Sequence, residues 1–239
     1  MKYYYKMALL IVLAINGSLQ AQDADVSSSG LSFGARVGAV VSEFSNGQPH
    51  TSSRLGYSVG GFVEYSFSPA FSVMTEPAYF QQGGTFVRFS DESRFGSSGT
   101  ISSLYTTENS IKLHGIDLPI LAKLKLNVGE GFNPHFVIGG AATYNFFAEN
   151  NFERTYYYNQ TFSTIDGYEV VSSDFETFSY SIVGGIGTSF IAGSKTISLD
   201  VRYKYGITPV KKGYSYIDIF TVQEDLYSNS LYFSVGVGF

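Results

Sequence analysis

Charged side chains stand at alternate positions within otherwise apolar stretches of this sequence, where they could form ion pairs or a polar path. Asp200, Arg202 and Lys204, for example, are separated by Val201 and Tyr203. Because successive side chains of a strand point to opposite faces, charges at this spacing share one face. The full set on the predicted strands is Arg36, Glu64, Glu76, Asp117, Lys123, Lys125, Asp200, Arg202 and Lys204.

This set is nearly balanced in charge and has two possible roles. It could line a polar channel or a proton path, or it could form a salt-bridged network that fills a closed interior and fixes the strand register. The interior of an eight-stranded barrel is just wide enough for side chains to fill, and buried charges are tolerated there only when paired. The structural role is therefore favoured, and Glu76→Ala or Arg202→Ala is expected to lower thermal stability.

The histidines offer little chemistry. His50, His114 and His135 are scattered along the chain without the spacing of metal ligands, so we expect no metal site. His114, with Ser110 and Glu108 nearby, is the one candidate for the hydrolytic set that a lipid A-modifying barrel would need. That combination is ordinary for a loop, and we expect no catalytic residues, no enzyme activity and no cofactor.

The elements that must position the charges are eight stretches with apolar or aromatic residues at every second position. Their lengths equal or slightly exceed the roughly 9–11 residues with which a tilted strand crosses a bilayer. Pro77 cannot donate a ladder hydrogen bond, which predicts a local irregularity. Ile111 and Leu113 are out of phase with Ile116 and later residues, which predicts a bulge near Gly115. The predicted strands are 31–42, 55–67, 71–81, 111–126, 134–146, 177–190, 196–207 and 227–239.

The connections between these strands alternate between long and short. Residues 83–110 and 148–175 are predicted to be the longest loops, and residues 85–90 could extend a strand beyond the membrane. Outer-membrane barrels have short periplasmic turns and longer outer loops. The predicted fold is therefore all-β: an eight-stranded antiparallel up-and-down transmembrane β-barrel with long extracellular loops, short periplasmic turns and both ends on the periplasmic side.

The distribution of residues distinguishes a membrane barrel from a soluble one. A lipocalin-like barrel would show the same alternation with its apolar face inside. Here the uncharged face carries most of the Tyr and Phe, while the charged face also collects Gly and Ser, which leave room for long side chains. This favours a lipid-facing outer surface and a polar lumen. The tyrosines predicted for the interfacial girdles are Tyr57, Tyr79, Tyr144, Tyr180, Tyr203 and Tyr227.

The N-terminus has the order of a secretory signal peptide: Lys2 and Lys6, an apolar stretch at 7–15, then small and polar residues. Cleavage is predicted after Ala21. The apolar stretch is about half of the roughly 20 residues that a spanning helix needs, so a membrane anchor is the weaker interpretation. The predicted organisation is signal peptide 1–21, short periplasmic lead 22–29 and barrel 30–239.

Two compositional features exclude further classes. The sequence contains no Cys, which excludes disulfides, thiolate metal sites and a lipid-modified cysteine. The formal net charge of -5 gives no reason to expect nucleic acid as a partner.

The last nine residues have an apolar face made by Leu231, Phe233, Val235, Val237 and Phe239. An open edge strand of this kind invites aggregation, so we expect it to pair with residues 31–42 and close a barrel. The pattern also resembles the C-terminal signal that the barrel-assembly machinery reads, which makes that machinery an expected partner during biogenesis.

The third outer loop is acidic and rich in tyrosine. Tyr156, Tyr157 and Tyr158 are candidates for recognition of a protein or a glycan. The carboxylates could bind divalent cations among lipopolysaccharide phosphates, but their spacing matches no calcium-loop pattern, and a solvated mobile loop is the simpler interpretation. Arg154 stands against six carboxylates: Glu149, Glu153, Asp166, Glu169, Asp174 and Glu176.

The segments 34–38 (GARVG) and 116–121 (IDLPIL), with a signal ending in Ala21-Gln22, resemble the PorT-like, outer membrane protein beta-barrel domain family of Bacteroidetes. The resemblance implies an outer-membrane barrel, surrounded by outer-membrane lipid and lipopolysaccharide. Some members are associated with secretion of virulence proteins or with gliding machinery, and no functional residues carry over.

Three functions remain open. We predict a structural or interaction barrel with a largely closed lumen, which presents surface loops or docks a periplasmic protein partner. The alternatives are a narrow porin-like channel for small solutes and, less favoured, a lipid A-modifying enzyme.

Overall fold

The computed structural model describes residues 30–45, 51–96, 99–126, 132–158, 161–211 and 225–239. The predicted signal peptide, its cleavage site and the lead before the first strand lie outside these residues, as does His50. The described elements are β1 Gly30–Ser45, β2 Thr51–Ser68, β3 Phe71–Thr75, β4 Ala78–Gly96, β5 Gly99–Lys125, β6 Asn133–Tyr158, β7 Thr161–Val170, the 3-10 helix η1 Ser172–Asp174, β8 Phe178–Ala192, β9 Lys195–Gly206 and β10 Tyr227–Gly238.

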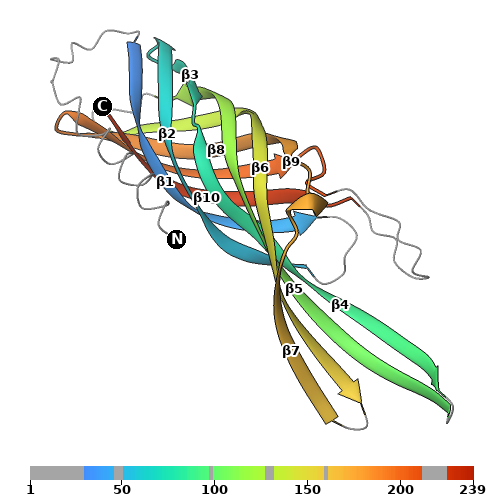
Figure 1. The fold of residues 1–239 in the computed structure, drawn as a ribbon. Coiled ribbons are helices and arrows are strands. Elements are labelled where there is room, and N and C mark those ends of the chain that lie inside the picture. The colour runs from blue at the N-terminus through green and yellow to red at the C-terminus, as the bar shows by residue number, and fades with distance from the viewer. Residues whose placement is uncertain (1–29, 46–50, 97–98, 127–131, 159–160, 212–224) are drawn as a thin grey trace, which may run out of the picture.

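The strands form one antiparallel sheet that closes into a ring (Figure 1). The sheet has ten strands, but β3 and β4 occupy one position between β2 and β5, and β7 pairs with β6 alone among the described strands. Eight positions therefore make up the ring, and the predicted eight-stranded up-and-down barrel is confirmed.

The ring closes where the sequence predicts. β1 pairs with β10 in an uninterrupted register from Gly34 opposite Gly238 to Ser45 opposite Tyr227. The amide of Phe239 adds a further bond to the carbonyl oxygen of Phe33 at 2.9 Å. Since both edges are paired along their length, the apolar terminal strand leaves no open edge in the barrel wall.

The predicted irregularity at Pro77 is confirmed. The third position of the ring is interrupted between Thr75, where β3 ends, and Ala78, where β4 begins. Pro77 has no amide hydrogen, but its carbonyl oxygen accepts a bond from the amide of Gly61 at 3.1 Å.

A bulge is present beside Gly115, as predicted, but its extra residue belongs to the neighbouring strand β6 and not to β5. His114 pairs with Phe147 and Gly115 with Asn145, so Phe146 is the extra residue in β6. β5 keeps its phase: Ile111 and Leu113 are buried in the interior, like the odd-numbered residues that follow. The prediction that β5 itself changes phase was wrong because these apolar side chains pack inside the barrel instead of facing lipid.

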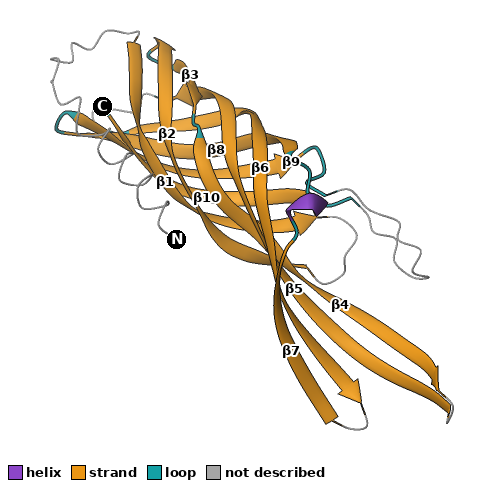
Figure 2. Ribbon diagram, viewed as in Figure 1, coloured by secondary structure: helices purple, strands orange, loops and turns teal. Residues whose placement is uncertain are grey.

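The two longest predicted loops are largely strands, and the expectation of loops there was wrong. β4 and β5 continue to Gly96 and Gly99, while β6 continues to Tyr158 and β7 returns beside it (Figure 2). Pairing in continuous register satisfies the backbone groups of these polar segments, and their Thr, Tyr and Phe residues favour strands. We call the parts beyond the ring the protruding sheet; it comprises residues 87–96, 99–108, 149–158 and 161–170.

The barrel has an apolar outer face and a polar inner face. Leu31 and Ile120 are 66% and 63% exposed, whereas their sequence neighbours on the opposite phase point inward. No described helix is long and apolar enough to cross a membrane. The termini of the described barrel lie at the same end as the short β2–β3 and β8–β9 turns, which we call the terminal end (Figure 1). The opposite end, which carries the protruding sheet, is the hairpin end.

Aromatic side chains form a belt near each end of the outer face. At the hairpin end the ring centroids of Tyr57 and Tyr79 lie 5.9 Å apart, and those of Tyr144 and Phe178 lie 5.3 Å apart. At the terminal end the ring of Phe67 contacts two others. Its centroid lies 4.7 Å from that of Tyr65 and 5.8 Å from that of Phe71. The stretch from Tyr57 to Tyr65 spans roughly 27 Å of strand. At a usual barrel tilt this is roughly 20 Å of thickness, comparable to the apolar band of outer-membrane barrels.

Candidate functional site

All nine charged residues singled out in the sequence lie on the inner face of the barrel. Eight of them are buried, and Lys125 is partly accessible at the terminal end. Their ion pairs join residues far apart in the sequence, such as Arg36 and Asp200. They divide into three clusters stacked along the lumen.

The central cluster is a closed circuit of two arginines and two carboxylates. Arg36 contacts Glu76 at 3.1 Å and also pairs with Asp200. Arg202 pairs with Glu76 through both terminal nitrogens and contacts Asp200 at 3.1 Å. Each charge therefore has two opposite neighbours, which offsets the cost of removing it from water.

His135 belongs to this cluster and was not recognised in the sequence. Its Nε2 lies 2.9 Å from Oδ1 of Asp200, and both side chains are fully buried. From the sequence, His135 was expected to be one of three scattered histidines without a role. The alternation that directs Phe136 and Ile138 outward directs His135 inward, so the signal was present. Gly187 permits the contact, since a Cβ there would lie 2.5 Å from Nε2 of His135.

A second cluster lies toward the hairpin end. Nζ of Lys204 donates to both oxygens of Asp117 at 2.6 Å and to Oγ1 of Thr143 at 3.0 Å. The hydroxyl of Tyr232 donates to Asp117 at 3.4 Å. The Lys204 ammonium also lies 5.2 Å from the ring centroid of Phe80, a cation–π contact that fills the space beside the pair.

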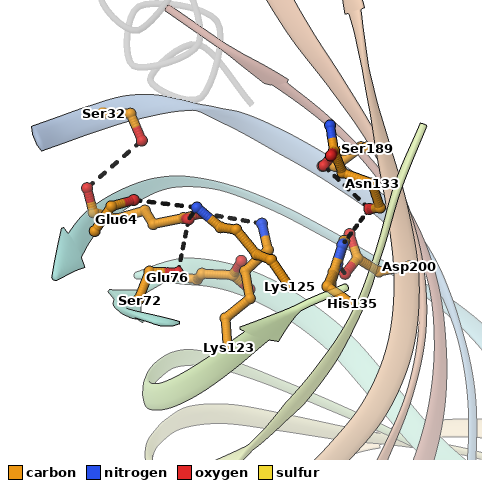
Figure 3. Close-up of polar contacts among 12 residues, drawn as sticks. Ser32, Glu64, Ser72, Glu76, Lys123, Lys125, Asn133, His135, Ser189 and Asp200 are labelled. Carbon is orange, nitrogen blue, oxygen red and sulfur yellow. Dashed lines mark hydrogen bonds and ion pairs between the residues drawn. The ribbon is translucent and has the colours of Figure 1, made fainter. Parts of the chain in front are cut away.

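The third cluster lies toward the terminal end, and one carboxylate serves two lysines in it. Glu64 contacts Lys123 at 3.0 Å and Lys125 at 2.6 Å, and it accepts a bond from Ser72 at 2.8 Å (Figure 3). Lys125 also donates to Ser66 at 3.1 Å. The cation count in this cluster therefore exceeds the carboxylate count by one.

Apolar side chains close the lumen at the hairpin end. We call them the apolar plug, and three partly buried hydrophobic residues pack against it. The rings of Phe44 and Phe175 lie 6.2 Å apart within it. The apolar plug consists of Phe44, Ile111, Leu113, Ala148, Phe175 and Val210.

Little free space remains between the clusters. The cavity bordered by Arg36, Glu76, Asp117, Arg202 and Lys204 measures about 60 Å³, room for only a few water molecules. Together with the apolar plug, this makes the middle and the hairpin end of the lumen a packed interior.

The protruding sheet is the second candidate site. Along β7 the exposed side chains occur on both faces, with Phe162 and Tyr168 72% and 57% exposed. The backbone edge of β7 opposite β6 has no paired strand among the described residues. Of the predicted tyrosine triplet, Tyr156 is half-buried and accepts a bond from Arg154 at 3.4 Å, and Tyr157 and Tyr158 end β6 beside it.

The acidic residues of the predicted third loop are ordered by strand register. Glu108, Glu153 and Asp166 stand directly opposite one another on three neighbouring strands and are all exposed. Closer to the ring, Lys112 bonds to Glu149 at 2.6 Å, and this bond lowers the pKa of the Glu149 carboxyl. Opposed carboxylates repel each other, so the row favours a cationic environment around the sheet.

The family described as "Outer membrane protein beta-barrel domain" matches residues 20–212. The chain belongs to this family. It is accordingly an outer-membrane β-barrel, in agreement with the closed ring, the apolar outer face and the aromatic belts.

Three solved structures are among those similar to this family member. Neisserial surface protein A is 14% identical, with a TM-score of 0.45 over 87% of this chain and 97% of that chain. OprG from Pseudomonas aeruginosa is 13% identical, with a TM-score of 0.41 over 89% and 98%. Ail of Yersinia pestis is 10% identical, with a TM-score of 0.39 over 87% and 98%. No curated protein matches the sequence.

The candidate hydrolytic set of this family member does not come together. Ser110 and His114 lie on one strand four positions apart, which is roughly 13 Å. His114 instead has Nδ1 2.7 Å from the hydroxyl of Tyr79, within the aromatic belt. The described residues contain no group of three or more His, Asp or Glu side chains placed to hold a metal ion.

Proposed function

We propose that this protein is a closed outer-membrane anchor whose protruding sheet binds a protein partner outside the barrel. The observation that carries the proposal is the β7 edge, which pairs with no second strand in the part of the chain that the structure describes and is flanked by exposed apolar side chains such as Phe162 and Tyr168. An extended segment of another protein can add to such an edge through main-chain hydrogen bonds, with side-chain contacts supplying selectivity.

The state of the lumen supports an anchor more than a channel. Ion pairs and the apolar plug fill the barrel from the central cluster to the hairpin end. A conducting path would require these buried pairs to separate, and separating a buried pair costs about 3–5 kcal/mol. A channel for small solutes is therefore the less favoured alternative.

The proposal includes no catalytic step. Ser110 is too far from His114 to be activated by it, because a nucleophile and its base must lie within hydrogen-bond reach. The proposed role is therefore binding. It does not include the lipid A-modifying activity that the sequence left open as a less favoured alternative.

Two further partners belong to the proposal. The barrel-assembly machinery would read the alternating Phe233, Val235 and Val237 of β10, together with Phe239 directly after it, before the ring closes. The resemblance to the PorT-like group of Bacteroidetes makes a component of a secretion machinery a candidate for the partner of the protruding sheet. Lipopolysaccharide and outer-membrane lipid would surround the outer face.

The test is crosslinking and pull-down from native outer membranes. One variant removes the outer part of the β6–β7 hairpin by joining Asn150 to Glu169 through an Asn-Gly turn, since these two residues pair directly. The proposal predicts that the full-length barrel captures a protein that the shortened barrel, present at an equal level, does not. Equal capture by both barrels would contradict it.

A further inference from the structure

The lumen is not filled at its terminal end. A cavity of about 380 Å³ lies there, bordered by the Glu64 cluster on one wall and by the start of β6, the end of β8 and the start of β9 on the other. Figure 3 shows Lys123, Lys125 and Glu64 grouped apart from Asn133 and Ser189 across this region. We call this cavity the vestibule.

The charged side chains around the vestibule are mostly cationic. Arg36, Lys123 and Lys125 line it, and Glu64 is the one carboxylate side chain among its lining residues. Arg36 is already matched in the central cluster by Glu76 and Asp200. Among the described residues, Glu64 is the one carboxylate that forms ion pairs with the two lysines. An excess positive charge therefore stands among the side chains of this wall, and the terminal carboxylate of Phe239, another lining residue, is the further anionic group at the cavity.

This imbalance is specific to the vestibule. The central cluster pairs two arginines with two carboxylates, and Lys204 pairs one-to-one with Asp117. An unmatched cation in a confined space is unfavourable unless water or an anion accompanies it. Lys125, whose side chain is 24% exposed, can meet such an anion without further rearrangement.

Neutral donors surround the same space. Ser66 accepts a bond from Lys125 at 3.1 Å, and Ser198 accepts one from Arg36 at 3.2 Å. A hydroxyl that accepts from a cation still has its own hydrogen to donate, and that hydrogen is polarised by the bond it receives. The side chains of Ser32, Asn133 and Thr196 also line the vestibule.

These features favour a small anion with several oxygens that can accept hydrogen bonds. Phosphate presents several acceptor oxygens to ammonium and hydroxyl donors, and lysine binds it as a compact point charge. The apolar plug blocks the hairpin end, so a ligand would enter from the terminal end. We propose that the vestibule binds the phosphate group of an anionic ligand, held by Lys125 and Lys123 and by the hydroxyl of Ser66.

The experiment uses the folded full-length barrel in a maltoside detergent, which carries no phosphate of its own. Inorganic phosphate is titrated calorimetrically, and phosphatidylglycerol is offered separately and followed by native mass spectrometry. Lys125→Gln leaves Glu64 and Lys123 as a one-to-one pair, so the barrel should fold. It is expected to weaken binding about tenfold, the usual weight of a charged hydrogen bond. Binding of inorganic phosphate identifies a soluble ligand; binding of phosphatidylglycerol alone identifies a lipid headgroup.

Lys195→Gln is the matched control, because Lys195 is an exposed lysine at the same end of the barrel and does not line the vestibule. It should bind like the wild type, whereas Ser66→Ala should bind more weakly. Absence of binding in both arms, or equal binding by the wild type and Lys125→Gln, would overturn the proposal.

Discussion

β5 and β6 pass through both the ring and the protruding sheet, and the alternation of their side chains has a different consequence in each region. Inside the ring, one face of each strand meets lipid and the other meets a packed lumen, so Asp117 and Thr143 are buried while Ile138 is exposed. Beyond the ring, Thr107 and Asn150 are still buried near the base of the protruding sheet, but Glu108 and Glu153 stand opposite each other and are exposed. The ring encloses one face of each strand, whereas the protruding sheet leaves exposed side chains such as Glu153 available to a partner.

The contrast is clearest for two arginines. Arg202 is buried in the lumen and contacts Glu76 and Asp200, while Arg154 in the protruding sheet donates to Thr107 at 3.1 Å and lies over the ring of Phe152. Buried ion pairs are costly to break, and exposed contacts contribute little. The two regions should therefore respond very differently to the same substitution.

The largest effect is expected from deleting Phe239, the residue that completes ring closure. Outer-membrane levels should fall several-fold because the closing strand loses its aromatic end. Once inserted, the barrel loses one backbone bond to Phe33, a ring contact with Phe33 at 6.5 Å and a cation–π contact with Lys195 at 5.2 Å, together about 2 kcal/mol of unfolding free energy. Membrane levels and the denaturant midpoint of refolded protein measure the two effects, and unchanged levels would contradict the assignment.

Arg202→Ala should destabilise the barrel by about 3–5 kcal/mol, because Glu76 and Asp200 each lose a partner while buried. Arg154→Ala should cost about 1 kcal/mol or less. Heat-modified gel mobility and thermal unfolding in detergent compare the variants. Equal stability of both would show that the lumen charges do not form an interdependent network.

Shortening the β6–β7 hairpin at Asn150 and Glu169 should leave the melting temperature of the ring within a few degrees of the wild type. The removed residues pair with one another and with the outer part of β5, not with the strands that close the lumen. A marked fall in melting temperature would mean that the protruding sheet supports the ring instead of being carried by it.

The smallest effect is expected at Glu149, near the base of the protruding sheet. Its folded-state pKa is lowered by the bond from Lys112, so its stabilisation is present at neutral pH and is lost as the pH falls below the usual range of a glutamate. Glu149→Gln should remove about 0.5 kcal/mol near pH 7 and make no difference in acid. Unfolding midpoints at the two pH values test this, and an equal difference at both would refute it.

The sequence predicts the ring well because alternation reports the environment of each strand directly. The face of β9 on which Asp200, Arg202 and Lys204 lie follows from period two alone, and the pairing of β10 with β1 follows from the need to cover an apolar edge strand. Which cation meets which carboxylate does not follow, since Arg36 and Asp200 come together only through the register of β1, β10 and β9.

The protruding sheet was missed because its signal is not periodic. Residues 83–110 are rich in Ser, Gly and Thr, a composition that also suits loops, and the exposed apolar residues of β7 fall on both faces of the sheet, as Phe162 and Ile165 do. The orientation of Ile111 and Leu113 was predicted wrongly for a related reason. An apolar residue on the inner face can belong to the apolar plug instead of facing lipid. Pairing with a neighbouring strand, which no single segment reveals, decided both cases.

Conductance in planar bilayers tests the closed lumen most directly. Wild-type barrel, inserted and verified as folded, should produce no stable open-state current, because Arg36, Glu76, Arg202 and Asp200 form one buried circuit beneath the apolar plug. Arg202→Ala should show brief openings if it remains folded. Sustained wild-type currents that vanish when the lumen is plugged would contradict the account and establish a channel.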